Sequence, residues 1–222
     1  MILDHSRKMG VFFVPKTGSA TVCSLFKDYS LDENIHNHKD LSRVIRKNPD
    51  IDFSTYQFWA FYRDPVDRFL SALVYQRRAP NFSTRFLHYF LGDQALDISC
   101  LAVNSYSGWS SDQQAMLESV SLQDFLTSNF ITDADPILFK NQIDWLNYSN
   151  VTLLNYGNFA SEIQVLATAW GIAVPDPLPN INTSVKLPTD PTAATLDPAT
   201  LQQIKDLYRA DYQFFASKGI SF

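Results

Sequence analysis

A run of small polar residues follows a short hydrophobic stretch near the N-terminus. The sequence VFFVPKTGSAT occupies residues 11–21, so a lysine, a glycine and several hydroxyl residues come after four residues that suit a buried strand. If a helix begins at Ser19, its first turn offers free backbone N–H groups and roughly half a positive charge. Lys16 adds a full charge, and the small side chains let an anion reach the backbone. The loop is therefore expected to hold a phosphate-like group. The alternative is an ordinary strand-to-helix turn with a solvated lysine.

The order of the residues argues against a nucleoside triphosphatase. A Walker A loop reads GxxxxGK[ST], with the lysine after the second glycine. Here Lys16 precedes Gly18. No acidic residue stands clearly at the end of an apolar strand to hold Mg²⁺, so we expect no metal.

A second segment, FYRDPVDRFLSALVY at residues 61–75, places an arginine where a strand ends and a serine on the helix that follows. Arg63 and Ser71 could clamp a second phosphate through a guanidinium and a hydroxyl group. The alternative is that Arg63 forms a structural ion pair with Asp64 or Asp67, and that Ser71 is ordinary helix surface.

Together the two segments resemble the sulfotransferases that use 3′-phosphoadenosine 5′-phosphosulfate (PAPS). PKTGSAT is followed about fifty residues later by RxPxxRxxSxxY, matched at Arg63, Pro65, Arg68, Ser71 and Tyr75. The resemblance assigns the 5′-phosphosulfate to Lys16, Thr17, Gly18, Ser19, Ala20 and Thr21. It assigns the 3′-phosphate to Arg63 and Ser71, and it places Ser184, in the late loop NINTS, at the nucleotide.

The resemblance also implies a base. In the uronyl 2-O-sulfotransferase branch an H-x-H element lies between the two motifs and contains the catalytic base. His36-Asn37-His38 resembles that element. We therefore expect His38 to take the proton of the acceptor hydroxyl with help from His36, while Lys16 stabilises the leaving phosphate. Two exposed loop histidines are the alternative, and Glu33 or Asp40 is the next candidate for the base. Two histidines at i, i+2 make a poor metal site.

Strands and helices alternate along the chain. Strands are predicted at 11–14, 56–62 and 151–156, and helices at 19–29, 40–47, 64–76, 83–91, 121–127, 138–146, 159–170 and 200–218. Gly171 suits a helix C-terminus, and Asp197-Pro198 suits a helix start. The pattern predicts an α/β fold with a mainly parallel central sheet and helices on both faces. The resemblance makes this a P-loop-like three-layer fold, in which ligands bind at the carboxyl ends of the strands.

Composition limits the other functions. The 222 residues are 45% hydrophobic, and we expect a single sulfotransferase-like domain, residues 1–222, with a helical acceptor-side insertion at about 80–135. A net charge of −5 argues against nucleic acid and anionic membranes as partners. Cys23 and Cys100 are expected to be small buried hydrophobes. No signal peptide or membrane span is visible, which favours a cytoplasmic protein, or a luminal one only if an anchor was trimmed. Sequons stand at Asn81, Asn147, Asn150 and Asn182.

The expected function is thus transfer of a sulfuryl group from PAPS, giving 3′-phosphoadenosine 5′-phosphate (PAP), to a hydroxyl of a glycan or other small acceptor. Two alternatives stay open: a P-loop nucleotide-dependent kinase or phosphotransferase, and a non-catalytic nucleotide-binding module. The sequence does not indicate the oligomeric state.

Overall fold

The computed structural model describes most of the chain in two compact units. The described residues are 1–26, 38, 41–78, 89–90, 111, 115, 118–133, 136–179 and 187–222. Unit 1 comprises Met1–Pro65, Lys140–Asn182 and Ala210–Phe222, and unit 2 comprises Val66–Phe139 and Thr183–Arg209.

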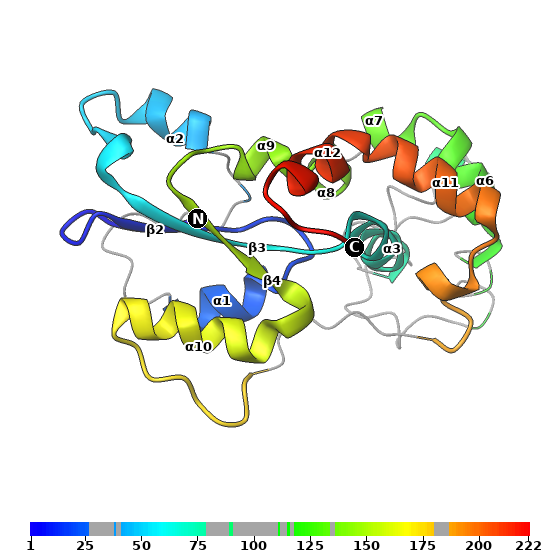
Figure 1. Ribbon diagram of the computed structural model, residues 1–222. Coiled ribbons are helices and arrows are strands. Elements are labelled where there is room, and N and C mark those ends of the chain that lie inside the picture. The colour runs from blue at the N-terminus through cyan, green and yellow to red at the C-terminus, as the bar shows by residue number, and fades with distance from the viewer. Residues whose placement is uncertain are drawn as a thin grey trace. The chain divides into compact units, whose positions relative to one another are not determined.

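Unit 1 contains a four-stranded sheet with the order β1-β2-β3-β4 (Figure 1). The strands are β1 (Ile2–Asp4), β2 (Met9–Phe12), β3 (Gln57–Tyr62) and β4 (Val151–Asn155). β2, β3 and β4 are parallel, and β1 is antiparallel to β2. The sheet is therefore mixed but mainly parallel, and the predicted α/β class is confirmed.

The edge strand β1 was not predicted. It has only three residues, too few to show a hydrophobic alternation, and it is fixed by pairing across a tight connection, with Ile2 opposite Val11 and Asp4 opposite Met9. β2 also begins two residues earlier than predicted and ends at Phe12. Gly10 in β2 lies against the ring of Phe58 in β3. A Cβ at position 10 would stand only 2.5 Å from that ring, so glycine leaves the space that the ring occupies.

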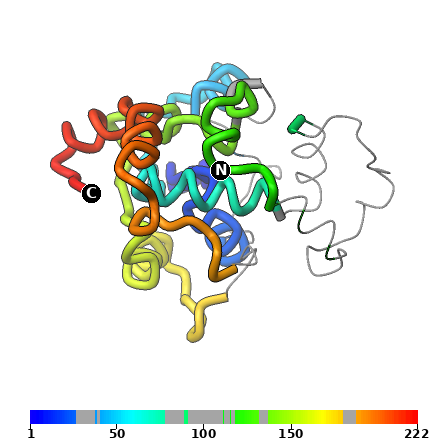
Figure 2. The backbone as a smooth tube through the Cα atoms, turned by 90° about the vertical axis from the view of Figure 1, so that its right-hand side faces the viewer, coloured from blue at the N-terminus to red at the C-terminus, as the bar shows by residue number. Residues whose placement is uncertain are grey.

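One face of the sheet is covered by α1 (Ser19–Phe26) and α10 (Phe159–Trp170), as Figures 1 and 2 both show. Alternate strand residues point to this face, as the two-residue repeat of a strand requires. The buried cluster here includes Val11, Phe13, Trp59 and Phe61 from the sheet side, and Val22, Phe26, Ile163, Leu166 and Trp170 from the helices.

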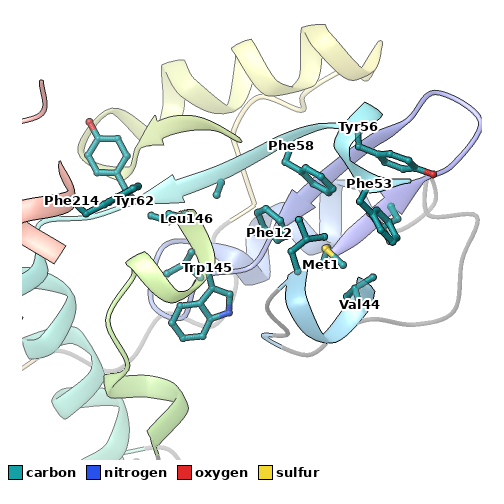
Figure 3. Close-up of a cluster of buried hydrophobic side chains, with 14 of the residues drawn as sticks. Met1, Phe12, Val44, Phe53, Tyr56, Phe58, Tyr62, Trp145, Leu146 and Phe214 are labelled. Atoms are coloured by element: carbon teal, nitrogen blue, oxygen red, sulfur yellow. The ribbon is translucent and has the colours of Figure 1, made fainter. Parts of the chain in front are cut away.

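The opposite face carries α2 (Leu41–Lys47), α9 (Ile143–Leu146) and α12 (Arg209–Ser217). Figure 3 shows the cluster under these helices, in which side chains of the intervening strand positions meet the helical ones. Its members include Phe12, Val14, Phe58, Ala60, Tyr62, Val44, Trp145, Leu146, Phe214 and Phe215. Within unit 1 the sheet therefore has helices on both faces, as predicted.

Two predicted helices are wrong in extent. The predicted helix 138–146 is two short helices, α8 (Pro136–Phe139) and α9, separated by residues 140–142. The predicted helix 200–218 is divided at Tyr208 into α11 (Pro198–Leu207) and α12. Tyr208 is buried and its hydroxyl donates to the Phe139 carbonyl at 2.9 Å, so long-range packing fixes the break.

Other predicted boundaries are confirmed. α10 ends at Gly171, which is left-handed (φ 63°), and Asp197 caps α11 by accepting from two backbone N–H groups. The short helix η5 (Tyr156–Asn158) links β4 to α10, and the short helices η2 (Phe53–Thr55) and η6 (Ala193–Thr195) lie elsewhere in the chain.

Unit 2 is helical in its described part, with α3 (Pro65–Arg78), α6 (Leu122–Thr127), α7 (Phe130–Asp133), α8 and α11. Its core is aromatic and includes Phe69, Phe125, Phe130 and Phe139. Arg68 is fully buried in this core, where it donates to the Leu138 carbonyl at 3.0 Å. Most of the predicted insertion at 80–135, including helix 83–91 apart from residues 89–90, lies outside the described residues.

Across the described ranges, no helix has the length and apolar character that crossing a membrane requires.

Candidate functional site

The candidate site lies at the carboxyl edge of the sheet in unit 1. β2, β3 and β4 run parallel, so the segments that follow them come together at one edge (Figure 1). These segments are residues 13–18 after β2, Arg63 after β3 and η5 after β4.

The loop at 13–18 contains two residues in the left-handed region of backbone conformation. Lys16 and Gly18 both have positive φ, 66° and 78°. A left-handed conformation interrupting a right-handed backbone turns successive N–H groups toward a common side, where they form a concavity for an anion. α1 begins directly afterwards, with the Val22 N–H donating to the Gly18 carbonyl at 3.1 Å. The loop therefore joins this concavity to a helix N-terminus.

Gly18 has no room for a side chain. A Cβ at this position would stand 2.6 Å from Phe159 Cε2 and 3.1 Å from Tyr156 Cε2. Glycine is therefore required both by the positive φ and by the aromatic rings that follow β4.

The loop hydroxyls are partly committed to the protein itself. The buried Thr17 donates through Oγ1 to the Val14 carbonyl at 2.9 Å, and Thr21 donates to the Pro179 carbonyl at 3.2 Å. Each hydroxyl has a single O–H donor. Because these hydroxyl hydrogens already bond backbone carbonyls, Thr17 and Thr21 have their backbone N–H groups, and not their side chains, to offer to an anion. Ser19 and Ala20 lie in the first turn of α1 and are partly exposed.

Arg63 lies beside this loop, as the sequence predicts. Its Nη1 donates to the Lys16 carbonyl at 3.4 Å, and its Cζ lies 4.9 Å from the centre of the Tyr156 ring. The side-chain amide of Gln142, which is fully buried, holds the backbone of Arg63 by accepting from its N–H at 3.0 Å and donating to its carbonyl at 2.8 Å. The guanidinium is thus placed between the loop and the ring that follows β4.

One ring nitrogen of His38 is fixed by a hydrogen bond, and the other has no hydrogen-bond partner among the described residues. Its Nδ1 lies 2.7 Å from the Phe13 carbonyl. A carbonyl only accepts, so Nδ1 carries the hydrogen and Nε2 keeps its lone pair in the neutral ring. Burial lowers the pKa of His38 below its ordinary value, the bond to Phe13 opposes this, and the positive charge of Lys16 lowers the pKa further. His38 is therefore neutral near pH 7 and suited to accept a proton.

Trp145 and Gln142 lie in the segment KNQIDWL, residues 140–146. The structure gives both a defined contact. Trp145 is buried and its Nε1 donates to the His38 carbonyl at 3.2 Å, in addition to packing in the core.

Several expected site residues are not placed at this edge. His36, Ser184, Glu33 and Asp40 lie outside the described residues. Ser71 is on α3 in unit 2 and is partly exposed. Arg68, which belongs to the second motif, is a core residue of unit 2 rather than a surface cation.

In the described part of the chain, no three or more His, Cys, Asp and Glu side chains gather as a metal site. Cys23 is half-buried on α1 rather than fully buried as expected, and Cys100 is not described.

Four residues thus come together within unit 1: Lys16, Gly18, His38 and Arg63. They combine a loop with left-handed backbone, two cations and a neutral imidazole. Comparisons of the chain with family models, with curated proteins and with solved structures found no match.

Proposed function

We propose that this protein is a PAPS-dependent sulfotransferase with a P-loop-like fold, and that it transfers a sulfuryl group to a hydroxyl of a carbohydrate or another small acceptor. The observation that carries the proposal is the meeting of the left-handed Lys16–Gly18 loop with Arg63 and with a neutral His38 at one sheet edge. The resemblance of the two sequence motifs to the PAPS-binding motifs supports it.

The residues fit an anionic nucleotide. The loop offers backbone N–H groups, and Gly18 adds no side chain that could cover them or meet the rings of Phe159 and Tyr156. Lys16, Thr17, Gly18, Ser19, Ala20 and Thr21 would hold the 5′-phosphosulfate. As the sequence resemblance assigns, Arg63 and Ser71 would hold the 3′-phosphate, the guanidinium through charge-assisted hydrogen bonds, and Ser184 would lie at the nucleotide. PAPS, when bound, supplies a sulfuryl group attached to a phosphate leaving group.

The chain's own residues have separate tasks. The Lys16 ammonium group supplies positive charge where negative charge develops on the leaving oxygen. His38 Nε2 takes the proton of the acceptor hydroxyl, a contribution of ~10²–10⁴-fold in rate. The Phe13 carbonyl holds the required tautomer beforehand and stabilises the imidazolium that forms. The resemblance gives His36 an assisting role.

The acceptor is proposed to be small or weakly charged. The net charge of −5 gives no sign of the broad cationic groove that a long polyanionic chain would need.

The test is incubation with labelled PAPS and a panel of hydroxylated acceptors, read by mass spectrometry as an added sulfo group. Lys16→Ala is expected to abolish transfer nearly completely. His38→Ala is expected to reduce turnover by ~10²–10⁴-fold while PAP still binds. His5→Ala is the matched control, because His5 bonds the Tyr56 hydroxyl instead of the loop, and it should leave transfer unchanged.

The pH profile gives a second measurement in the same assay. Transfer requires neutral His38, so activity should fall as pH drops through its lowered pKa. The acid limb is expected below 6.5, the ordinary histidine value. Normal turnover in His38→Ala would refute the base assignment, and a wild-type protein that neither binds PAP nor transfers a sulfo group would refute the function.

Ligand choice separates this function from the alternatives. A sulfotransferase should be thermally stabilised by PAP without Mg²⁺, whereas a kinase or phosphotransferase should be stabilised by ATP only with Mg²⁺. A non-catalytic nucleotide-binding module would keep its biological activity in Lys16→Ala and His38→Ala.

A further inference from the structure

We propose that the short helix α9, together with the preceding Gln142, is a brace that positions both the anion-binding Arg63 and the base His38. Gln142 and Trp145 are then positioning residues of the site. The effect on catalysis rests on the proposed function, whereas the effect on the loop and on His38 does not.

The first arm of the brace starts at Gln142. Its buried amide pairs with both backbone groups of Arg63, the first residue beyond β3. The pairing of β3 with β4 ends at Tyr62 opposite Asn155. The Gln142 amide therefore provides hydrogen-bond partners for the backbone of the next residue, Arg63. Arg63 Nη1 then donates to the Lys16 carbonyl at 3.4 Å. A buried side chain 79 residues away in sequence thus fixes the backbone from which the guanidinium reaches the loop.

The second arm starts at Trp145, three residues along and therefore on the next helical turn. Its Nε1 donates to the His38 carbonyl at 3.2 Å, and His38 Nδ1 bonds the Phe13 carbonyl at 2.7 Å. The two arms therefore reach the loop at Phe13 and at Lys16. One orients the base, and the other orients the cation.

The brace is itself anchored to α12. The carboxylate of Asp211, which is fully buried, accepts from the N–H of Ile143, the first residue of α9, at 2.9 Å. A four-residue helix has few internal hydrogen bonds, so its orientation depends on such outside contacts. Trp145 and Leu146 add to this by packing in the same cluster as Phe214 (Figure 3).

The second arm is tested by Trp145→Phe, which keeps an aromatic ring and removes the N–H donor. With its carbonyl released, His38 should become more solvated, and its pKa should rise toward the ordinary value because burial is the main cause of the lowering. NMR titration of His38 should show this rise, and the acid limb of transfer should move upward with it. PAP affinity should stay within about twofold of the wild-type value.

The matched control is Trp170→Phe. Trp170 is equally buried in unit 1, but its Nε1 has no hydrogen-bond partner in the described structure. This variant should leave both the His38 titration and PAP affinity unchanged. An unchanged His38 titration in Trp145→Phe would overturn the second arm.

The first arm is tested by Gln142→Met, which removes both amide contacts with Arg63. PAP affinity should fall by about tenfold or more, while the His38 titration stays as in the wild type. Asn150→Leu is the matched control, because the Asn150 amide also holds backbone carbonyls, those of Phe53 and Tyr56 before β3. It should lose stability without losing PAP affinity.

A stability measurement accompanies these variants. Urea unfolding shows whether each variant is folded, and if Gln142→Met is not, Gln142→Glu keeps the acceptor for the Arg63 N–H and should give a smaller loss of PAP affinity. Wild-type affinity in both Gln142 variants would overturn the first arm. If the wild-type protein does not bind PAP at all, the proposed function fails, and the brace is still decided by the His38 titration and by the binding of pyrophosphate to the loop.

Discussion

Lys16 adopts a backbone conformation that few residues other than glycine accept, with φ of 66°. The left-handed region costs a residue with a Cβ roughly 1–2 kcal/mol. Such strain persists only where surrounding contacts hold it, and it gathers at functional positions. The hydrogen bond from Arg63 to the Lys16 carbonyl is one of those contacts. Lys16 therefore contributes both the left-handed backbone conformation of the loop and a positive charge beside it.

Gly18 allows a prediction at this scale. Gly18→Ala should abolish PAP binding and destabilise the protein, because the new Cβ meets Phe159 at 2.6 Å in addition to adopting a strained φ. Gly171→Ala is the control, with φ of 63° and no atom within 4 Å of a new Cβ. It should cost only the backbone strain, about 1 kcal/mol, and leave PAP affinity intact. Equal losses in urea unfolding and equal PAP affinities would show that the ring contact has no role.

The motif resemblance led us to expect that the segments of Lys16 and Arg63 converge, and in the structure Arg63 donates to the Lys16 carbonyl. The side-chain contacts that hold Arg63 and His38 could not be predicted from the sequence. Gln142 and Trp145 act across 79 and 107 residues, and no local pattern encodes such contacts. The hydroxyl of Thr17 was expected to face the anion, yet a nearby carbonyl takes its hydrogen.

At the scale of elements, the sequence predicted the strands and helices with strong periodicity and missed those set by tertiary contacts. α10 and its glycine end could be predicted because the signals are local. β1 could not be, since a three-residue strand exists only through its pairing with β2. The breaks before α9 and at Tyr208 likewise depend on distant partners.

Asp4 gives a prediction about the connection between β1 and β2. Burial raises the pKa of this carboxyl, but hydrogen bonds from Ser6 and Arg7 outweigh it and lower the pKa from 3.8 to about 2. The carboxylate therefore stabilises the fold above pH 3.8, and this contribution is lost as pH falls through 2. Asp4→Asn should lower the free energy of unfolding at neutral pH by on the order of 1–3 kcal/mol, the value of a hydrogen bond to a charged group. It should also flatten the acid dependence between pH 4 and 2, measured by urea unfolding.

The chain contains a matched control for this pair. Asp206 and Arg209 form the same i, i+3 ion pair at 2.8 Å, but both side chains are largely exposed. Asp206→Asn should change stability little, because exposed pairs are screened by solvent. A similar response in both variants would mean that the burial of Asp4 is unimportant.

At the scale of the molecule, each compact unit is assembled from separate stretches of the chain. Unit 1 takes three and unit 2 takes two, so the backbone passes between them four times. Neither unit is one continuous segment that could fold on its own before the rest is made. The single domain stays a prediction, and the interleaved units lead to a test of it by unfolding.

Unfolding in urea should show one transition. In Trp109→Phe the remaining tryptophans, Trp59, Trp145 and Trp170, all lie in unit 1, so their fluorescence reports on that unit alone. Far-UV circular dichroism reports on helices in both units. Coincident curves are expected for cooperative unfolding. Separate midpoints would show that the units are independent domains.

The bond between Asp211 and Ile143 connects the proposed brace to a segment far along the chain. The loop that contains Lys16 precedes Asp211 by almost two hundred residues, so the proposed brace is complete only once residue 211 has been synthesised. A premature stop or a proteolytic cut shortly before residue 211 would therefore release α9 and loosen the proposed site, without altering any residue of the Lys16 loop itself.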